Sequence, residues 1–115
     1  MTAQGHPRAT FNRAIERGNL LVAEATAREI GKVSLGDALE LVALIAQHDS
    51  RRHGRAGARW TRRFLEEHPA AGLDDLALVV GCLSALGGPR HDTALTALRD
   101  LSQAATRKAA KPGVG

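Results

Sequence analysis

The residues best suited to chemistry in this 115-residue chain are arginines gathered in one short segment. The stretch RRHGRAGARWTRRFLEEH, residues 51–68, places six arginines within thirteen positions and then reaches two glutamates. A guanidinium stays charged in proteins and binds carboxylates or phosphates through a planar fork of N–H donors. The segment therefore predicts recognition of an anionic partner. Its arginines are Arg51, Arg52, Arg55, Arg59, Arg62 and Arg63.

The arginine segment also carries the whole formal charge of the protein. Residues 51–67 hold six arginines and two glutamates, a net charge of +4, which equals the +4 of the entire chain. Projected on a helix at about 100° per residue, the six arginines fall within an arc of about 120°. Trp60 and Phe64 fall on the other side. We therefore expect a helix with an arginine face toward solvent and an aromatic face toward the core.

Three interpretations of this face remain open. We predict a non-enzymatic interaction or adaptor module that docks an acidic partner protein on the arginines, because arginine is enriched at such interfaces. Phosphate contacts by a nucleic-acid-binding accessory protein are the alternative, although Trp60 points away from the arginines and offers no stacking platform. The third interpretation is a solvated face. In that case the arginines pair with Asp49, Glu40 or Asp75, or within Arg62–Glu66 and Arg63–Glu67.

Two glycines stand out inside the arginine segment. Gly54 and Gly57 would each cost a helix roughly 0.5–1 kcal/mol relative to alanine. Either the backbone of another helix approaches closely at these positions, or the helix begins nearer Arg55.

The elements that position the arginines are predicted to be helices throughout, because helix formers fill the chain and no alternating strand pattern occurs. The fold class is all-α, a compact bundle of five or six antiparallel helices arranged as successive, repeat-like helical hairpins. We expect one helical domain over 1–106 and a disordered basic tail over 107–115. The expected helices cover about 8–17, 20–30, 35–48, 51–67, 73–86 and 89–107.

The core is predicted from the two most apolar segments. The helices over 35–48 and 73–86 are apolar nearly all round, which indicates burial by neighbours on every side. The other helices are expected to cover them through Leu21 and Ala25, Trp60 and Phe64, and Leu95, Leu98 and Leu101.

Three resemblances bear on this fold. AIERGNLLVAEATAREIG, residues 14–31, resembles a tetratricopeptide-type helix pair, with small alanines around a Gly-Asn turn. That resemblance implies a helical hairpin. ERGNLLVAEATAREIG together with SLGDALEL is similar to small uncharacterised all-helical proteins of high-GC bacteria. Residues 25–41 also resemble a helix-turn-helix, but Asp37 replaces an apolar position of that motif.

No motif indicates catalysis, a metal or a cofactor. His48 and His53 do not share a helical face, and Ser84 has no evident histidine partner. Cys82 is the only cysteine, so no disulfide forms within the chain, which is typical of a reducing cytosol. The longest apolar stretch, 76–88, is shorter than the roughly 20 residues that span a bilayer. We therefore expect a cytoplasmic protein that uses no membrane, with its oligomeric state left open.

Overall fold

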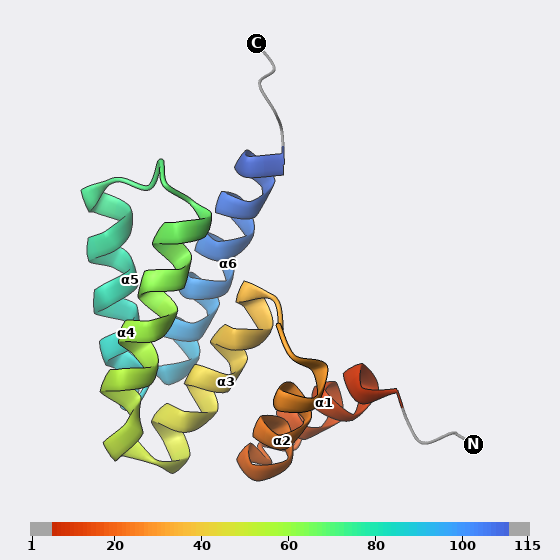
Figure 1. The fold of residues 1–115 in the computed structure, drawn as a ribbon. Helices are drawn as coiled ribbons and strands as arrows, with labels where there is room; N and C mark the ends of the chain where they lie inside the picture. The colour runs from red at the N-terminus through yellow and green to blue at the C-terminus, as the bar shows by residue number, and fades with distance from the viewer. Residues whose placement is uncertain (1–5, 111–115) are drawn as a thin grey trace.

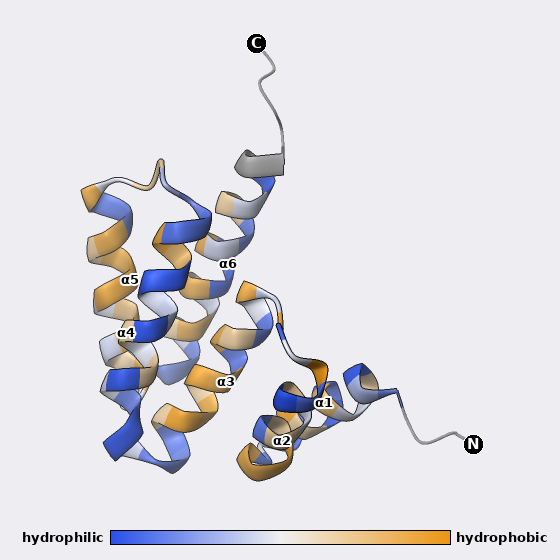
Figure 2. Cartoon of the chain, viewed as in Figure 1, coloured by the Kyte–Doolittle hydropathy of each residue, from blue (hydrophilic) through white to orange (hydrophobic). Residues whose placement is uncertain are grey.

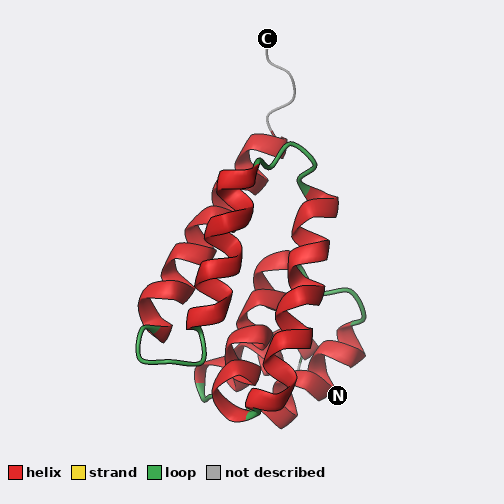
Figure 3. Ribbon diagram, turned by 90° about the vertical axis from the view of Figure 1, so that its left-hand side faces the viewer, coloured by secondary structure: helices red, strands yellow, loops and turns green. Residues whose placement is uncertain are grey.

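The computed structural model describes residues 6–110, and over that range the chain forms six α-helices and no strand (Figure 1). The all-α fold class expected from the sequence is confirmed. Figure 3 shows that the connecting loops are short and lie at the helix ends. The helices are α1 (Pro7–Glu16), α2 (Leu20–Ile30), α3 (Leu35–His48), α4 (Ser50–Glu67), α5 (Leu73–Ala85) and α6 (His91–Ala110).

Local side-chain chemistry sets the boundaries of α2 and α3. The Oδ1 atom of Asn19 accepts a hydrogen bond from the backbone N–H of Val22 at 3.1 Å, which caps the start of α2. The hydroxyl of Ser34 accepts one from the N–H of Asp37 at 3.1 Å and caps α3 in the same way. Between them, Gly31 ends α2 with a φ of 94°, a conformation that favours glycine.

The six helices form three successive hairpins, as expected. The closest helix pairs are α1 with α2, α3 with α4, and α5 with α6. Helices α3 to α6 stand side by side as a four-helix bundle, and the α1–α2 hairpin lies beside α3 at one end of that bundle (Figure 1). Because α3 contacts both parts, it is the element that joins them.

Two hydrophobic clusters hold these parts together. Figure 2 shows that α5 is hydrophobic along most of its length, whereas hydrophilic segments recur along α4. The larger cluster lies inside the four-helix bundle. Its most completely buried side chains are Leu39, Phe64, Val79, Leu86 and Leu98. The smaller cluster belongs to the hairpin and to one side of α3. It consists of Phe11, Ala14, Ala23 and Leu44.

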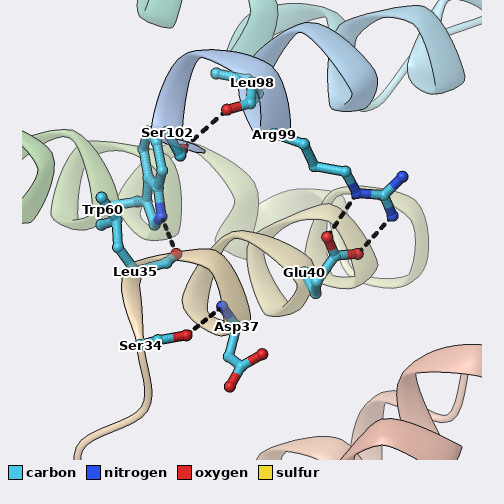
Figure 4. A network of polar contacts seen from close by, with 8 residues as sticks. All are labelled: Ser34, Leu35, Asp37, Glu40, Trp60, Leu98, Arg99 and Ser102. Carbon is cyan, nitrogen blue, oxygen red and sulfur yellow. Dashed lines mark hydrogen bonds and ion pairs between the residues drawn. The ribbon is translucent and has the colours of Figure 1, made fainter. Parts of the chain in front are cut away.

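The aromatic face of α4 points into the larger cluster, as the sequence predicts. Trp60 is 3% exposed, and its ring stacks on Phe64 with the ring centroids 5.6 Å apart. The indole Nε1–H donates a hydrogen bond of 3.0 Å to the backbone carbonyl of Leu35 (Figure 4). On the other side of α3, Glu40 accepts hydrogen bonds of 2.7 and 2.8 Å from Arg99 of α6 (Figure 4). These polar contacts fix α4 and α6 against α3.

The prediction that α2 covers the core through Leu21 and Ala25 is wrong. Leu21 is 78% exposed and Ala25 is exposed as well, so neither covers the core. Helix α2 packs on α1 and α3 through the opposite stripe, in which Ala23 and Thr26 are buried.

The expectation that α5 is buried on all sides is also wrong. Leu73, Leu78 and Val80 are 83%, 47% and 50% exposed. The physical reason is position, because α5 packs mainly against α4 and α6 and leaves its outer side without a neighbour. Uniform apolarity therefore identified the central helix α3 correctly but not the position of α5.

The C-terminal helix is longer than expected. Helix α6 continues to Ala110, whereas the sequence predicts an end near Arg107 and a disordered tail over 107–115. Residues 107–110 are therefore helical, and the rest of the predicted tail, 111–115, lies outside the described residues. Within the described part of the chain, none of the helices combines the length and apolarity needed to cross a membrane.

Candidate functional site

All six predicted arginines lie on one uninterrupted helix. Helix α4 is regular from Ser50 to Glu67, so the alternative of a helix that begins nearer Arg55 is wrong. Five of the arginines are exposed and Arg63 is half-buried. Because Trp60 and Phe64 are buried on the other side, the arginines form one outward ridge along the helix.

A groove of about 430 Å³ runs along one flank of this ridge. Helix α3 forms its floor and lies between α4 and α2 (Figure 1). Glu24 of α2 stands on the wall opposite the arginines. We call this the arginine groove. Its lining includes Arg52, Arg55, Arg59 and Arg63 from α4, and Ala38, Leu41, Val42 and Ile45 from α3.

The structure thus divides the six predicted residues into two groups. Four of them line the arginine groove, and Arg51 and Arg62 do not. On the helical projection Arg51 and Arg62 sit at the far edge of the arginine arc, toward α5, which explains the division. The side chain of Arg51 is 93% exposed and lies 4.0 Å from the carboxylate of Asp49, at the outer limit of an ion pair.

Two of the groove arginines are already paired with carboxylates. Arg52 donates to both carboxylate oxygens of Glu24, so this ion pair connects α4 to α2 across one end of the groove. The hydrogen bond and charge of Glu24, with a smaller contribution from Asp49, raise the pKa of Arg52. Arg63 pairs with Glu67 on its own helix at 2.6 Å, as the i,i+4 spacing predicts.

The remaining three arginines carry uncompensated charge. Arg55, Arg59 and Arg62 have no carboxylate within 4.0 Å among the residues that the structure describes. Arg55 and Arg59 are four residues apart, so they lie next to each other on the same wall of the groove.

Two of the carboxylates that were expected to pair with these arginines bind other groups. Glu40 binds Arg99, and Asp75 accepts a hydrogen bond of 3.2 Å from the backbone N–H of Gly72 at the start of α5. The predicted i,i+4 pair between Arg62 and Glu66 does not form within the described residues. Of the internal partners expected for a solvated face, only Asp49 and Glu67 are therefore found beside the arginines.

No aromatic ring is available for stacking at this site. The chain contains two phenylalanines, one tryptophan and no tyrosine. Phe11, Trp60 and Phe64 are 0%, 3% and 1% exposed, so every aromatic side chain belongs to a hydrophobic cluster. A surface that binds single-stranded nucleic acid by base stacking requires the opposite arrangement.

The other side chains that could take part in catalysis or bind a metal make contacts within the fold. His53, expected at a helix end or on a solvated surface, is half-buried, with Nε2 2.8 Å from the carbonyl oxygen of Leu83 on α5. The hydroxyl of Ser84 donates to the carbonyl of Val80 at 2.8 Å, and Cys82 packs against the core. Across the described side chains, no group of three His, Cys, Asp or Glu residues is placed to hold a metal ion.

The opposite wall of the groove is the part that sequence reasoning missed. Glu24 has Arg28 four residues later on its own helix, and this spacing favours a local pair. Glu24 binds Arg52 instead, 28 residues away. Only the packing of α2 beside α3 reveals this contact, so no sequence signal was available for it.

Comparison of the chain with models of protein families, with curated proteins and with solved structures found no match.

Proposed function

We propose that the protein is a non-enzymatic interaction module that docks an acidic segment of a partner protein in the arginine groove. The observation that carries this proposal is the pair of uncompensated guanidinium groups, Arg55 and Arg59, beside an apolar floor. A reducing cytoplasm, in which the single Cys82 stays a thiol, is the compartment that we propose for it.

The floor of the groove favours a protein over a nucleic acid. Ala38 and Leu41 are only half-buried in the free chain and leave apolar surface beside the arginines. A phosphodiester backbone has no apolar side chains to cover such a floor, whereas a peptide segment supplies carboxylates and apolar groups together. Burying the floor also lowers the local dielectric constant and strengthens the charge-assisted bonds at its edge.

The spacing of the free arginines defines what the partner must present. Residues four apart on a helix have their Cβ atoms about 5–6 Å apart. Carboxylates one helical turn apart on a partner helix match the spacing of Arg55 and Arg59. An amphipathic helix with Asp or Glu at i and i+4, and with leucines on the adjacent stripe, is therefore the segment that fits the groove.

Defined probes test this proposal. A fluorescent amphipathic peptide with this acidic pattern is titrated with the protein and followed by anisotropy. We expect the Arg55→Ala/Arg59→Ala variant to weaken binding about a hundredfold or more, since two bonds to charged groups are lost and each is worth about 1.5–3 kcal/mol. The matched control is Arg13→Ala/Arg90→Ala, which removes the same charge from exposed positions outside the groove and should bind as the wild type does.

A duplex DNA of similar length and a peptide without leucines complete the experiment. If the DNA binds more tightly, with a steep loss of affinity as salt rises, the site contacts phosphates and the nucleic-acid function replaces our proposal. The two peptides could instead bind with equal affinity, and both double variants could lose that affinity to the same extent. This result would mean that net charge alone attracts the peptides and that no docking groove exists.

A further inference from the structure

Glu24 lies inside the arginine groove, on the wall opposite the arginines. Its carboxylate accepts hydrogen bonds from both terminal nitrogens of Arg52, and the bond from Nη1 to Oε1 measures 3.2 Å. A carboxylate of an acidic partner would use the same fork of donors. The groove of the free chain therefore already holds one carboxylate of the kind that the proposed partner supplies.

Arg52 belongs to the same row of side chains as the two uncompensated arginines of the groove. It precedes Arg55 by three residues and Arg59 by seven, so the three lie at successive turns of α4. All three line the arginine groove. An acidic helix that binds Arg55 and Arg59 through carboxylates four residues apart therefore reaches Arg52 with a third carboxylate, one turn further along. Glu24 occupies that position in the free chain.

The pair between Arg52 and Glu24 can open without disturbing the hydrophobic packing. Helix α2 packs on α1 and α3, and neither residue of the pair belongs to a hydrophobic cluster. The side chain of Arg52 is 47% exposed, and that of Glu24 is 20% exposed. A carboxylate that arrives from solvent can therefore reach the guanidinium of Arg52.

A second cation is available to Glu24 on its own helix. Arg28 follows four residues later, is exposed, and has no carboxylate within 4.0 Å among the described residues. A glutamate that precedes a basic residue by four is the favourable order for a pair on one helix. Glu24 can thus leave Arg52 and keep an ionic partner.

We propose that the acidic segment of the partner carries a third carboxylate that displaces Glu24 from Arg52, and that Glu24 then pairs with Arg28. Because the exchange takes place in the arginine groove, this inference rests on the proposed function. Two carboxylates that shared one guanidinium would repel each other, so the arriving group replaces Glu24 instead of joining it. Glu24 is therefore an internal competitor, and it sets how much a third carboxylate adds to binding.

Three fluorescent peptides test this competition by anisotropy. All are amphipathic helices with the same leucine stripe. The first carries glutamates at i, i+4 and i+8, which face the three arginines in either direction of binding. Each of the other two has glutamine in place of the first or the last of these glutamates. The readout is the affinity of the three-acid peptide divided by the affinity of each two-acid peptide, which gives two ratios for every variant.

Removing the competitor should change one of these ratios. In Glu24→Gln, the ratio for the peptide that lacks the glutamate facing Arg52 should rise about tenfold or more above its wild-type value, because Arg52 is then free to bond to a charged group. Adding Arg52→Gln should remove this gain. The matched control is Glu29→Gln, which loses the same charge at an exposed position of α2 outside the groove lining. It should leave both ratios unchanged, and circular dichroism checks that every variant is folded.

The move of Glu24 to Arg28 has its own readout. Arg28→Gln removes the cation that receives the displaced carboxylate and should lower the same wild-type ratio about twofold. Arg13→Gln removes an equal charge from an exposed position outside the groove and should not change it. An unchanged ratio in Arg28→Gln overturns this part of the exchange.

The same peptides separate the competition from the proposed function. Arg55→Ala/Arg59→Ala could weaken all three peptides while Glu24→Gln leaves both ratios at their wild-type values. The groove would then bind acidic segments, but Glu24 would not compete with them, and the inference would be overturned. A gain that survives Arg52→Gln, or an equal gain in Glu29→Gln, overturns it as well. If Arg55→Ala/Arg59→Ala leaves peptide binding unchanged, the proposed function fails and the competition fails with it.

Discussion

The indole Nε1–H of Trp60 donates a 3.0 Å hydrogen bond to the carbonyl of Leu35, and this bond joins the middle of α4 to the first residue of α3. The wall of the arginine groove belongs to α4 and its floor to α3. Trp60 therefore helps to fix the position of the wall relative to the floor, together with the other side chains of the larger cluster. The same ring stacks on Phe64 and anchors the underside of the arginine ridge.

Replacing Trp60 should destabilise the fold by an amount that depends on the new residue. Trp60→Phe keeps most of the apolar volume but loses the hydrogen bond to Leu35, worth about 0.5–1.5 kcal/mol. Trp60→Ala also leaves a cavity and should cost about 3–5 kcal/mol. Urea unfolding followed by circular dichroism measures both free energies. An alanine variant as stable as the wild type would contradict the buried position of the ring.

Replacing the glycines of α4 with alanine should stabilise the fold. Gly54→Ala and Gly57→Ala should each raise the free energy of unfolding by about 0.5–1 kcal/mol, because the added Cβ meets open space or an ordinary contact. The measurement is urea unfolding at low protein concentration, where self-association does not contribute. The control is Gly31→Ala, which should destabilise because the φ of 94° strains any side chain there. A loss of stability at Gly54 would contradict the observation that no other helix of the described chain comes within 4 Å of a Cβ placed there.

The contact between Arg52 and Glu24 should persist at alkaline pH. The pKa of Arg52 is raised above its ordinary value, so its contribution to stability is present below the ordinary arginine pKa and is lost only as the pH rises beyond it. A lysine at this position has an ordinary pKa of about 10.4 and loses its charge earlier. We therefore expect the thermal midpoint of Arg52→Lys to fall more steeply than that of the wild type between neutral pH and pH of about 11. Parallel curves for the two proteins would show that the ion pair does not stabilise the fold.

The floor of the arginine groove should matter for peptides and not for nucleic acids. Leu41 is half-buried at the floor, and Leu41→Gln keeps a similar size while it removes apolar surface. We expect about a tenfold loss in affinity for the acidic amphipathic peptide, since burying a leucine side chain is worth about 1.5–3 kcal/mol. Anisotropy with a duplex DNA probe should give the same affinity for both proteins. Equal loss for both probes would mean that the substitution disturbs α3 itself.

Local sequence signals predicted the helices of this fold well. The capping side chains Asn19 and Ser34 act within three residues, so their effect is visible in the sequence. The Trp60 and Phe64 stripe correctly identified the inner face of α4. The arginine ridge was predicted from the same helical period, because the period sets the face on which every residue of α4 lies once one face is known.

Contacts between distant segments could not be predicted in the same way. Glu24 binds Arg52 although Arg28 is nearer along the chain, because the choice depends on where α2 lies beside α3. Helix α5 is apolar all round but lies at an edge, where Leu73 and Val80 stay exposed. Composition indicates how much apolar surface a helix carries, but not which neighbours are present to cover it.

The α1–α2 hairpin has its own small cluster around Phe11 and Ala23, into which α3 inserts Leu44. Its exposed positions on α2, such as Leu21 and Ala25, contribute nothing to the interior of the four-helix bundle. The outward face of α2 can therefore be changed without altering the side chains that pack inside the four-helix bundle. This division gives a protein engineer a way to vary the wall opposite the arginines, and so to test the binding that we propose, without rebuilding the rest of the molecule.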